Sequence, residues 1–335
     1  MIKSSTNSDR LRLPFLLSPV GKDYIWGGNR LNTVLHKNID LNPLAETWEC
    51  STHPDGMSIA ASRDFRGKAL GDILNEHPEL LGTKAAGAKD IPILVKFIDA
   101  HKDLSVQVHP SDEYARENEN GQNGKSEMWY VLEAEPGSKL VYGFVHDMTR
   151  EGARKSIEDG TITKYLQRVD IHTGEVFFVP AGQVHAICAG ALIAEIQQNS
   201  NLTYRMYDYD RVDASGKKRA LHVEKALDVA YLKSSAEPRQ PMRVLRYWPG
   251  CASELLCRCK YFQVERLLVN TQCNTTAFYH AQEGTFQVLL CTQGNGALYT
   301  EDFCLQLKMG DCVFVPASDY TMNLRGHAEL LNIIC

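Results

Sequence analysis

Four polar side chains in the middle of the chain are of the types that bind a divalent metal ion. Gln107 and His109 lie in LSVQVHP, Glu127 lies in GKSEMWY, and His185 lies in VPAGQVHA. Two imidazoles, one carboxylate and one amide oxygen suit zinc or a similar borderline divalent ion. Such a site requires that three separate segments of the chain meet in one place.

The segments around these residues have the alternation that is typical of β-strands. Residues 104–109, Leu-Ser-Val-Gln-Val-His, alternate strictly, so a strand places Ser105, Gln107 and His109 on one face. A second apolar strand is expected directly after the Gly-Gln-Asn-Gly loop. His185 follows a Pro-Ala-Gly turn that ends another β-rich run. We therefore expect the four polar residues to converge in the mouth of a β-barrel.

Length and composition describe an ordinary globular protein. At 335 residues the chain is long enough for roughly two domains, each able to bury a core. The net charge of −5 and 23% charged residues give no broad basic field, so no nucleic-acid partner is expected. The N-terminus lacks the apolar core and cleavage site of a signal peptide, and no run approaches the roughly 18 apolar residues of a membrane span. We expect a cytoplasmic enzyme with no membrane partner.

Ten cysteines raise the question of disulfides or a thiolate metal cluster, since eight of them lie between Cys251 and Cys335. No pair has the Cys-x-x-Cys spacing of a zinc site. Cys291, Cys304 and Cys312 lie inside apolar runs, where cysteine acts as a small hydrophobic residue. We expect reduced, buried thiols in a reducing compartment.

The order of strand and helix patterns predicts a mainly β protein with two domains. Residues 1–240 form the first domain and residues 241–335 the second, with a polar, proline-containing linker at 234–243. The remaining ninety or so residues are almost wholly strand-like. Helices are expected only as insertions in the N-terminal half, at about 66–90, 149–165 and 221–233.

The second domain echoes the sequence of the first. GEVFFVPAGQVHAI (174–187) resembles GDCVFVPASDYTMN (310–323), and WYVLEAEPGSKLVYG (129–143) resembles FQVLLCTQGNGALYT (286–300). Each copy has a strand, a glycine turn and a strand, followed by a second turn ending in Val-Pro-Ala. The repeat predicts two small antiparallel β-barrels, or jelly rolls.

The candidate ligands belong to the first copy only. In the second copy Thr321 stands where His185 stands, and Gly284 stands where Glu127 stands. We therefore expect the C-terminal barrel to be a structural domain without metal ligands.

Seven motifs follow one another through nearly the whole N-terminal half: WGG (26–28), AETWECSTHPDG (45–56), LVKFIDA (94–100), LSVQVHPSDEYA (104–115), GKSEMWYVL (124–132), VPAGQVHAI (179–187) and QNSNLTYRMYDYDR (198–211). Together they resemble the cupin superfamily, and specifically the type I mannose-6-phosphate isomerases in their short bacterial form. The C-terminal barrel matches in pattern rather than in marker residues. The resemblance implies two cupin-type barrels and one zinc ion per chain.

The resemblance also implies ligands and an activity. Matched position by position, the family's metal ligands fall on Gln107, His109, Glu127 and His185. The implied reaction interconverts mannose 6-phosphate and fructose 6-phosphate, so the expected partner is a small sugar phosphate. Such an aldose–ketose isomerase removes a proton from C2 and returns it to C1 through an enediol. A metal ion or cation stabilises the developing oxyanion, and a carboxylate near the reacting carbons carries the proton.

Four further residues match family positions that face the sugar. Arg205 matches the active-site arginine, Glu195 matches an acidic residue beside the substrate, and Lys125 and Ser105 match proposed substrate contacts. Arg205, Glu195 and Lys125 are therefore candidate catalytic residues, and Ser105, Lys125 and Arg205 are candidate substrate-binding residues.

Each of these residues also has a structural interpretation, which the sequence leaves open. Arg205 could pair with Asp208 or Asp210, and Lys125 could simply pair with Glu127. Glu195 could be one polar residue of a wet cavity, and the Ser105 hydroxyl could bond only to backbone or water. For three other residues in the N-terminal motifs, packing and backbone bonding at the barrel edge are expected rather than catalysis: Trp26, Glu46 and Trp48.

Two other functions compete with the isomerase. The alternative is a sugar-phosphate-binding cupin that acts as a sensor or accessory protein; it could keep the ligands yet lose Arg205 or Glu195, and both are present. An iron-dependent cupin oxygenase is expected to have a His-rich ligand set, which the Gln107 amide and the Lys and Arg residues do not match. The sequence allows either a monomer or a homodimer.

Overall fold

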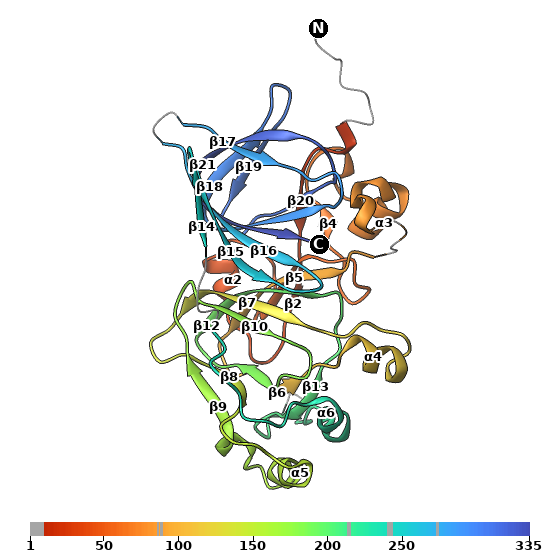
Figure 1. The fold of residues 1–335 in the computed structure, drawn as a ribbon, viewed down its shortest axis with the longest axis vertical. Coiled ribbons are helices and arrows are strands. Elements are labelled where there is room, and N and C mark those ends of the chain that lie inside the picture. Colours follow the sequence, from red (N-terminus) through yellow and green to blue (C-terminus); the bar gives the residue numbers. More distant parts are fainter. Residues whose placement is uncertain (1–9, 86, 88–89, 213–215, 240–243, 273–274) are drawn as a thin grey trace.

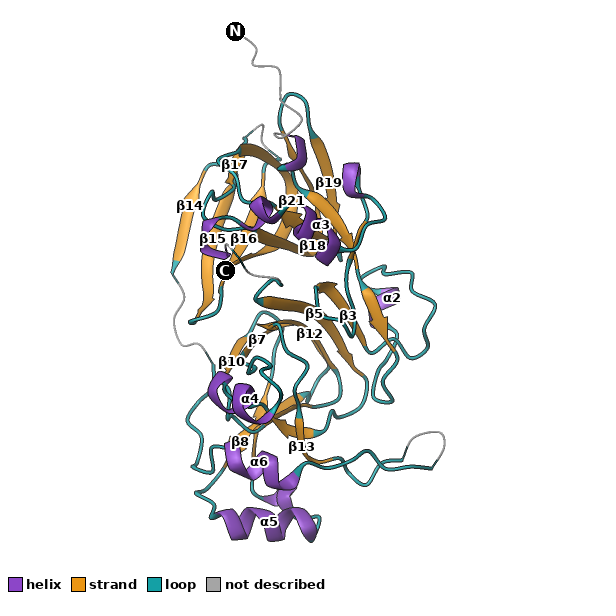
Figure 2. Ribbon diagram, turned by 90° about the vertical axis from the view of Figure 1, so that its right-hand side faces the viewer, coloured by secondary structure: helices purple, strands orange, loops and turns teal. Residues whose placement is uncertain are grey.

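The computed structural model describes residues 10–85, 87, 90–212, 216–239, 244–272 and 275–335. Strands of the N-terminal half build a barrel of two facing antiparallel sheets, and those of the C-terminal half build a second one above it (Figure 1). Short helices lie at the periphery, as Figure 2 shows. The expected class, mainly β with two antiparallel barrels, is confirmed. None of the described helices is both long and apolar enough to cross a membrane.

The N-terminal barrel consists of a six-stranded and a five-stranded sheet. In spatial order the six-stranded sheet contains β10 (Val176–Val179), β7 (Glu127–Ala134), β12 (Ala191–Gln198), β5 (Ile93–Ala100), β3 (Glu46–Cys50) and β2 (Val20–Lys22). The five-stranded sheet contains β13 (Tyr204–Tyr207), β6 (Val106–Val108), β11 (His185–Ile187), β8 (Lys139–Phe144) and β9 (Leu166–Asp170).

The third sheet has ten strands and forms the C-terminal barrel. Its main path runs β14 (Leu245–Trp248), β15 (Cys251–Arg258), β16 (Gln263–Asn270), β21 (Thr321–Ile334), β18 (Gln287–Tyr299), β20 (Cys312–Val315), β1 (Phe15–Ser18) and β4 (Ile59–Ala60), with β17 (Ala277–His280) on β21 and β19 (Cys304–Lys308) on β18. Two of these strands, β1 and β4, come from the N-terminal end of the chain. Strand pairing therefore crosses the expected boundary at residue 240, and the division at that residue stays a prediction.

The six-stranded sheet is buried on both faces. One face packs against the five-stranded sheet, and the other packs against the C-terminal barrel. Its two central strands, ILVKFIDA and ALIAEIQQ, are buried at every position, as expected for strands covered on both sides. Alternation then sends Lys96 and Glu195 into the N-terminal barrel, while Val95, Phe97 and Ile196 face the C-terminal one.

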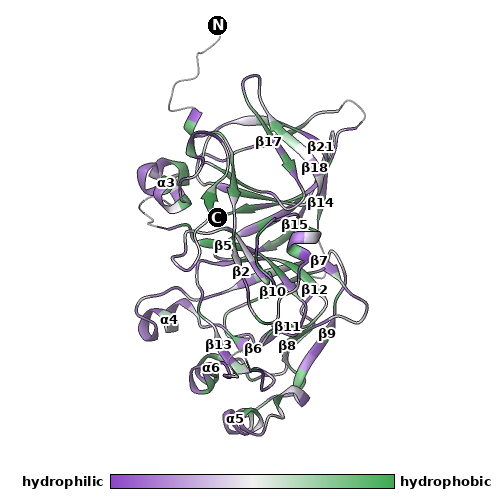
Figure 3. Ribbon diagram, turned by 180° about the vertical axis from the view of Figure 1, so that it is seen from behind, coloured by the Kyte–Doolittle hydropathy of each residue, from purple (hydrophilic) through white to green (hydrophobic). Residues whose placement is uncertain are grey.

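The helices lie mainly where the sequence predicts insertions. The segment 66–90 contains α3 (Leu70–Glu76) and two 3-10 turns, with residues 86, 88 and 89 outside the described part; a further 3-10 turn, Arg63–Phe65, precedes it. The other two insertions contain α5 (Arg150–Glu158) with a 3-10 turn at Ile162–Lys164, and α6 (Val223–Val229); both helices cover the five-stranded sheet. Apolar residues concentrate on the strands of both barrels, whereas α5 is largely hydrophilic (Figure 3).

Two short helices were not predicted. The strand expected to run on from residue 104 is interrupted by α4 (Asp112–Asn118), whose first turn is capped by the Ser111 hydroxyl. The sequence does contain a signal for α4, because Ser-Asp-Glu at residues 111–113 is a typical helix start. The other, α2 (Arg30–Thr33), has one turn and no side-chain cap, so the sequence carries little signal for it.

Strand register corrects one pairing within the internal repeat. In the first barrel Val179 pairs with Glu127, and in the second Val315 pairs with Gln287. Because Val179 and Val315 end the same repeated motif, Gln287 occupies the place of Glu127; the expected Gly284 was wrong. The sequence alignment of the two strands was shifted by three residues relative to the observed pairing. A shift by an odd number assigns a residue to the opposite face of the strand.

The described cysteines, all except Cys273, are free thiols. Cys291 and Cys312 are buried as expected. Cys304 was expected to be buried and is exposed, because it lies on the outer face of β19. Within the expected linker, residues 240–243 lie outside the described part, while Arg239 is anchored to the N-terminal half by an ion pair with Glu175 at 2.8 Å.

A buried ion pair joins the two barrels. Lys37 Nζ lies 2.7 Å from Glu49 Oε2 on β3 and also donates to the Gly310 carbonyl of the C-terminal barrel. Both side chains are at most 5% exposed. Burial raises the pKa of Glu49, and Lys37 acts in the opposite direction. The ionised state of the Glu49 carboxylate thus depends on its ion pair with Lys37.

We expect Lys37→Met to destabilise the protein by about 3–5 kcal/mol, because it leaves a carboxylate buried without its cation. Urea denaturation measures the loss. Lys68→Met is the matched control, since Lys68 pairs with Glu76 at 2.6 Å on the surface, and its midpoint should not change measurably. Equal midpoints for the two variants would contradict the structural role of the buried pair.

Candidate metal centre and active site

One row of paired residues crosses the inner face of the five-stranded sheet. His185 on β11 pairs with Gln107 on β6, and Gln107 pairs on its other side with Arg205 on β13. Directly paired residues of neighbouring strands point to the same face. The register therefore brings two candidate ligands and the candidate arginine together. Their alternation with Val106 and Val108, which pack against the helices outside, fixes this face as the inner one.

A facing set of side chains comes from the six-stranded sheet. Glu195 on β12 pairs with Trp129 on β7 and with Lys96 on β5, and Glu127 lies two residues before Trp129 on the same face. All four side chains are at most 4% exposed on a residue basis. Lys96, Glu127 and Glu195 each lie in an otherwise apolar strand. Strand pairing and burial therefore fix the positions of their charges inside the barrel.

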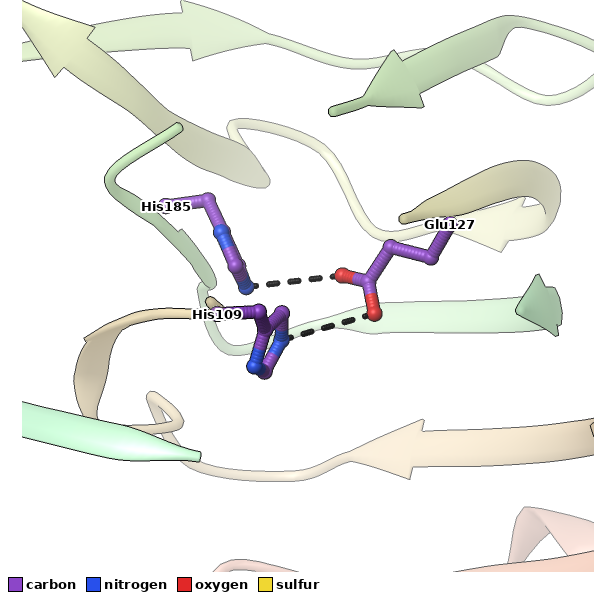
Figure 4. A group of neighbouring side chains, drawn as sticks. All are labelled: His109, Glu127 and His185. Atoms are coloured by element: carbon purple, nitrogen blue, oxygen red, sulfur yellow. Dashed lines mark ion pairs between the residues drawn. The ribbon is translucent and has the colours of Figure 1, made fainter. Parts of the chain in front are cut away.

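Three of the four predicted ligands form a compact group. The ligand atoms of His109, Glu127 and His185 all lie within 4.8 Å of one another. His109 Nε2 lies 3.5 Å from one Glu127 oxygen, and His185 Nε2 lies 3.4 Å from the other (Figure 4). Tetrahedral ligands at zinc distances of 2.0–2.2 Å lie about 3.4 Å apart. The spacing therefore fits one zinc ion at the centre of the group.

Both histidines present the nitrogen that a metal requires. His109 Nδ1 donates to the Leu202 carbonyl and His185 Nδ1 donates to the Gln183 carbonyl, each at 2.8 Å, as assigned from the geometry. This tautomer leaves the Nε2 lone pair of each ring facing Glu127. His109 Nε2 and Glu127 Oε1 are buried without a hydrogen-bond partner among the described residues. Unpaired acceptors of this kind are what a bound cation would satisfy.

The charge states also suit a metal. Burial, together with the charge of Lys125, lowers the pKa of His109 to about 3, and burial lowers the pKa of His185. Burial alone would raise the pKa of Glu127, but the charge of Lys125 outweighs it and holds the pKa well below its usual range. The group thus consists of two neutral imidazoles and one carboxylate at neutral pH.

The fourth predicted ligand lies beside this group. The Gln107 side-chain amide is 3.4 Å from His185 Nε2, and the Ser105 hydroxyl donates to the Gln107 oxygen at 3.4 Å. Turning the amide by 180° about its last side-chain bond exchanges the positions of its oxygen and nitrogen. The amide oxygen of Gln107 can therefore reach the position of a fourth ligand.

A cavity of about 270 Å³ opens next to the metal group. Gln107 borders it, as do the four residues proposed from the sequence to act on the sugar: Ser105, Lys125, Glu195 and Arg205. A cavity of this volume suits a small molecule rather than a polymer.

Glu195 and Lys125 are linked through charge. Trp129 Nε1 donates to one Glu195 oxygen at 2.9 Å, and the other oxygen lies 3.8 Å from Lys125 Nζ and 3.4 Å from Lys96 Nζ. Burial and the charge of Glu127 raise the pKa of Glu195, while the lysines oppose this. Lys125 lies 2.9 Å from Glu127 as well, so its ion pair and its place at the cavity coexist.

The structural alternative for Arg205 is not observed. Asp208 pairs with Arg211 and Arg219, and Asp210 pairs with Lys218. Arg205 instead donates from Nη1 to the Ala220 carbonyl at 2.9 Å, and its Nε is buried without a hydrogen-bond partner within the described ranges. Its guanidinium remains available to a ligand in the cavity.

Sequence reasoning missed three charged residues that line the cavity. Lys96 and Glu46 form an ion pair of 3.5 Å, and Glu46 also accepts from Trp48 Nε1 at 2.8 Å. Packing and backbone bonding rather than catalysis were expected for Glu46; its carboxylate lines the cavity, and that expectation stays a prediction. Arg219 lines the cavity as well, although it follows a loop with no strand signal. A lysine in the middle of LVKFIDA was the one available signal, because lysine is rarely buried without a partner.

The C-terminal barrel supports the segment that carries Lys125 and Glu127. Tyr261 donates to one oxygen of Asp112 at 3.0 Å. The other Asp112 oxygen accepts from the Gly124 amide at 3.0 Å and from the Gln198 side chain at 2.9 Å. Gln198 in turn accepts from the Ser126 amide at 2.9 Å. A chain of hydrogen bonds thus runs from the second barrel to the backbone on both sides of Lys125.

Comparison with known proteins places this arrangement in a family. The family models for the phosphomannose isomerase type I catalytic domain and the mannose-6-phosphate isomerase cupin domain match residues 15–136 and 253–334. A mannose-6-phosphate isomerase of Bacillus subtilis is 34% identical over 318 residues, which cover 95% of this chain and 98% of that protein. The chain belongs to the type I mannose-6-phosphate isomerase family.

Solved structures of mannose-6-phosphate isomerases share the fold. A crystal structure of the mannose 6-phosphate isomerase from Bacillus subtilis aligns with a TM-score of 0.88 at 33% identity, covering 96% of this chain and 99% of that one. A zinc-bound mannose 6-phosphate isomerase aligns with a TM-score of 0.76 at 16% identity, with the same coverage of the two chains. The two-barrel architecture is therefore that of the family.

The low pKa of His109 predicts a loss of stability in acid for the metal-free protein. The unfolded histidine takes up a proton below about pH 6.5, whereas the folded one does not until about pH 3. Its contribution is thus present above pH 6.5 and is lost as the pH falls toward 3. Between pH 7 and pH 5 the loss amounts to about 2 kcal/mol.

Urea denaturation of the metal-free protein at pH 7 and pH 5 measures this loss. In the His109→Gln variant the difference between the two pH values should shrink by about 2 kcal/mol. His172→Gln is the control, since His172 is 75% exposed, and its acid loss should equal that of the wild type. An unchanged acid loss in His109→Gln would contradict the account.

Proposed function

We propose that the chain is a zinc-dependent isomerase that interconverts mannose 6-phosphate and fructose 6-phosphate. One observation carries the proposal: a group of neutral imidazoles and a carboxylate that fits a zinc ion lies directly beside Gln107 and Lys125, which line a cavity together with Glu195 and Arg205. Membership of the isomerase family and the zinc-bound relative of the same fold support it. We infer that one zinc ion per chain is held by Gln107, His109, Glu127 and His185. The free thiols support a cytoplasmic location.

The protein's own groups divide the work of proton transfer. When bound, zinc supplies a positive charge that polarises the sugar's carbonyl and hydroxyl oxygens. Glu195 takes the proton from C2 of the open-chain aldose, the C–H electron pair forms the C1–C2 double bond, and the C1 carbonyl pair moves onto O1, which takes up a proton to give an enediol. O2 then loses its proton as the C2 carbonyl forms, and Glu195 returns its proton to C1. Burial near Glu127 raises the pKa of Glu195, which makes the carboxylate a better base.

The cations around Glu195 hold it and the substrate in place. Lys96 and the Trp129 indole fix the carboxylate from two sides. Lys125 bridges Glu127 and Glu195, so its charge lies where negative charge grows on the substrate oxygens. Arg205 supplies a second cation on the opposite sheet, and Ser105 offers a hydroxyl to the sugar. A sensor without catalysis has no need for a proton carrier beside the metal group, so the enzyme is favoured.

The direct test is a coupled assay that follows fructose 6-phosphate formation from mannose 6-phosphate, before and after chelation of the metal. We expect turnover that is lost with the metal and returns when zinc is added back. No turnover by a folded, zinc-loaded preparation would refute the proposed function.

Replacing a metal ligand and replacing Arg205 should affect zinc binding differently. His109→Ala should lose both zinc and activity, because it removes a ligand from a group of few. Arg205→Ala should keep zinc and lose between about 100- and 1,000-fold in kcat/KM, the usual effect of removing one charge-stabilising donor. Metal analysis and steady-state kinetics on the same preparations separate the two. Missing zinc in Arg205→Ala would refute this division of roles.

Glu195→Gln tests the proton carrier. The amide keeps the size and the hydrogen bond from Trp129 but accepts no proton, so kcat should fall between about 100- and 10,000-fold with zinc retained. Exchange of the C2 proton of mannose 6-phosphate with deuterated water, measured by NMR, should fall in parallel. Exchange at the wild-type rate in a zinc-loaded variant would assign the proton to another group.

A further inference from the structure

Three arginines and one aspartate meet beside β13, on the side of the cavity that faces the six-stranded sheet. Arg219 donates from Nε and Nη2 to the two oxygens of Asp208, at 2.8 and 2.5 Å. Arg211 donates to the same carboxylate at 2.5 Å and, through Nη1, to the Asp103 carbonyl. Arg219 and Arg205 line the catalytic cavity, whereas Arg211 and Asp208 are not among its lining residues.

We propose that Arg219, together with Arg205, binds the phosphoryl group of the sugar phosphate and selects phosphorylated sugars. The inference rests on the proposed function, which it deepens by naming the residue that recognises the phosphate. In this arrangement Arg219 binds the phosphate. Arg211 helps to hold Arg219 in place, because both arginines pair with Asp208.

The position of Arg219 beside Arg205 follows from the chain. Arg205 Nη1 donates to the carbonyl of Ala220, the residue after Arg219. Burial and the neighbouring charge of Arg219 both lower the pKa of Arg205, so the two guanidinium groups lie close enough to repel each other. Two cations held together at the wall of a cavity form a site for a doubly charged anion, and a phosphate monoester carries about −1.5 to −2 at pH 7.

Charge around the cavity favours this side for the phosphate. The charged residues that line the cavity are four cations and two carboxylates. Both carboxylates, Glu46 and Glu195, lie against Lys96 on the six-stranded sheet. On the side of β13, Asp208 offsets one of the three arginines Arg205, Arg211 and Arg219, which leaves two net positive charges there. A phosphate against the six-stranded sheet would instead meet the carboxylates.

Arg219 also borders a second cavity of about 320 Å³, which is less suited to an anion. Three cations line that cavity together with four carboxylates, leaving one net negative charge. The catalytic cavity is thus the one whose charge complements a phosphate. The bidentate bond to Asp208 fixes the Arg219 side chain in advance, so binding a phosphate costs little side-chain entropy.

The test compares two Arg219 variants with a matched control, all loaded with zinc. Arg219→Ala removes the charge and the bond to Asp208, whereas Arg219→Gln removes the charge and keeps an amide that can bond to Asp208. Lys218→Ala removes the adjacent charge, which is exposed and lies outside the catalytic cavity. For each protein we measure kcat and KM for mannose 6-phosphate, competitive inhibition by inorganic phosphate, zinc content and melting temperature.

We expect KM and the inhibition constant of phosphate to rise together, between about 10- and 100-fold, in both Arg219 variants. The value of kcat should change far less, and Lys218→Ala should stay within about twofold of the wild type. A parallel rise in KM and in the phosphate constant separates phosphate recognition from a general disturbance of the site.

Wild-type KM and phosphate inhibition in Arg219→Ala would overturn the inference while leaving the isomerase intact. If the alanine variant does not fold, the glutamine variant decides by the same criterion. If the wild-type protein turns over no mannose 6-phosphate, the proposed function fails. Calorimetric titration with inorganic phosphate then decides separately: binding that is lost in Arg219→Gln supports the anion site, and unchanged binding refutes it.

Discussion

The fully buried carboxylate of Glu127 is the constraint on which the rest of the site depends. A carboxylate taken out of water must be neutralised by cations or hydrogen bonds, or it takes up a proton. Lys125 supplies one charge at 2.9 Å, and the two histidines face its oxygens with unprotonated nitrogens, an arrangement that a bound cation would satisfy. The metal group, the lysine and the neighbouring Glu195 are therefore one electrostatic unit.

The double burial of the six-stranded sheet makes this unit possible. Because the C-terminal barrel covers its outer face, the sheet can place Glu127, Lys96 and Glu195 on its inner face without exposing the apolar residues between them. Tyr261 and Asp112 extend this support to the backbone around Lys125. The second barrel keeps the jelly-roll plan, with Gln287 at the place of Glu127, and its contribution is to cover and brace the first.

Local sequence was sufficient to predict whatever depends on strand alternation and on short motifs. The alternating run 104–109 placed Ser105, Gln107 and His109 on one face, and the repeat with Val-Pro-Ala predicted two barrels. What could not be predicted depends on long-range register. Lys96 and Glu46 meet Glu195 only because three strands pair in one sheet, and the loop that carries Arg219 returns to β13 through bonds to Asp208 and Arg205. Cys304 and Gly284 were misplaced for the same reason, since a strand's face cannot be known without its partner.

The most direct test of the account is a crystal structure of the zinc-loaded protein with anomalous data on both sides of the zinc edge. We predict one zinc peak per chain among His109 Nε2, His185 Nε2 and a Glu127 oxygen, with the Gln107 amide oxygen turned toward it. A zinc-loaded crystal with no peak at this position, or with zinc bound elsewhere, would contradict it.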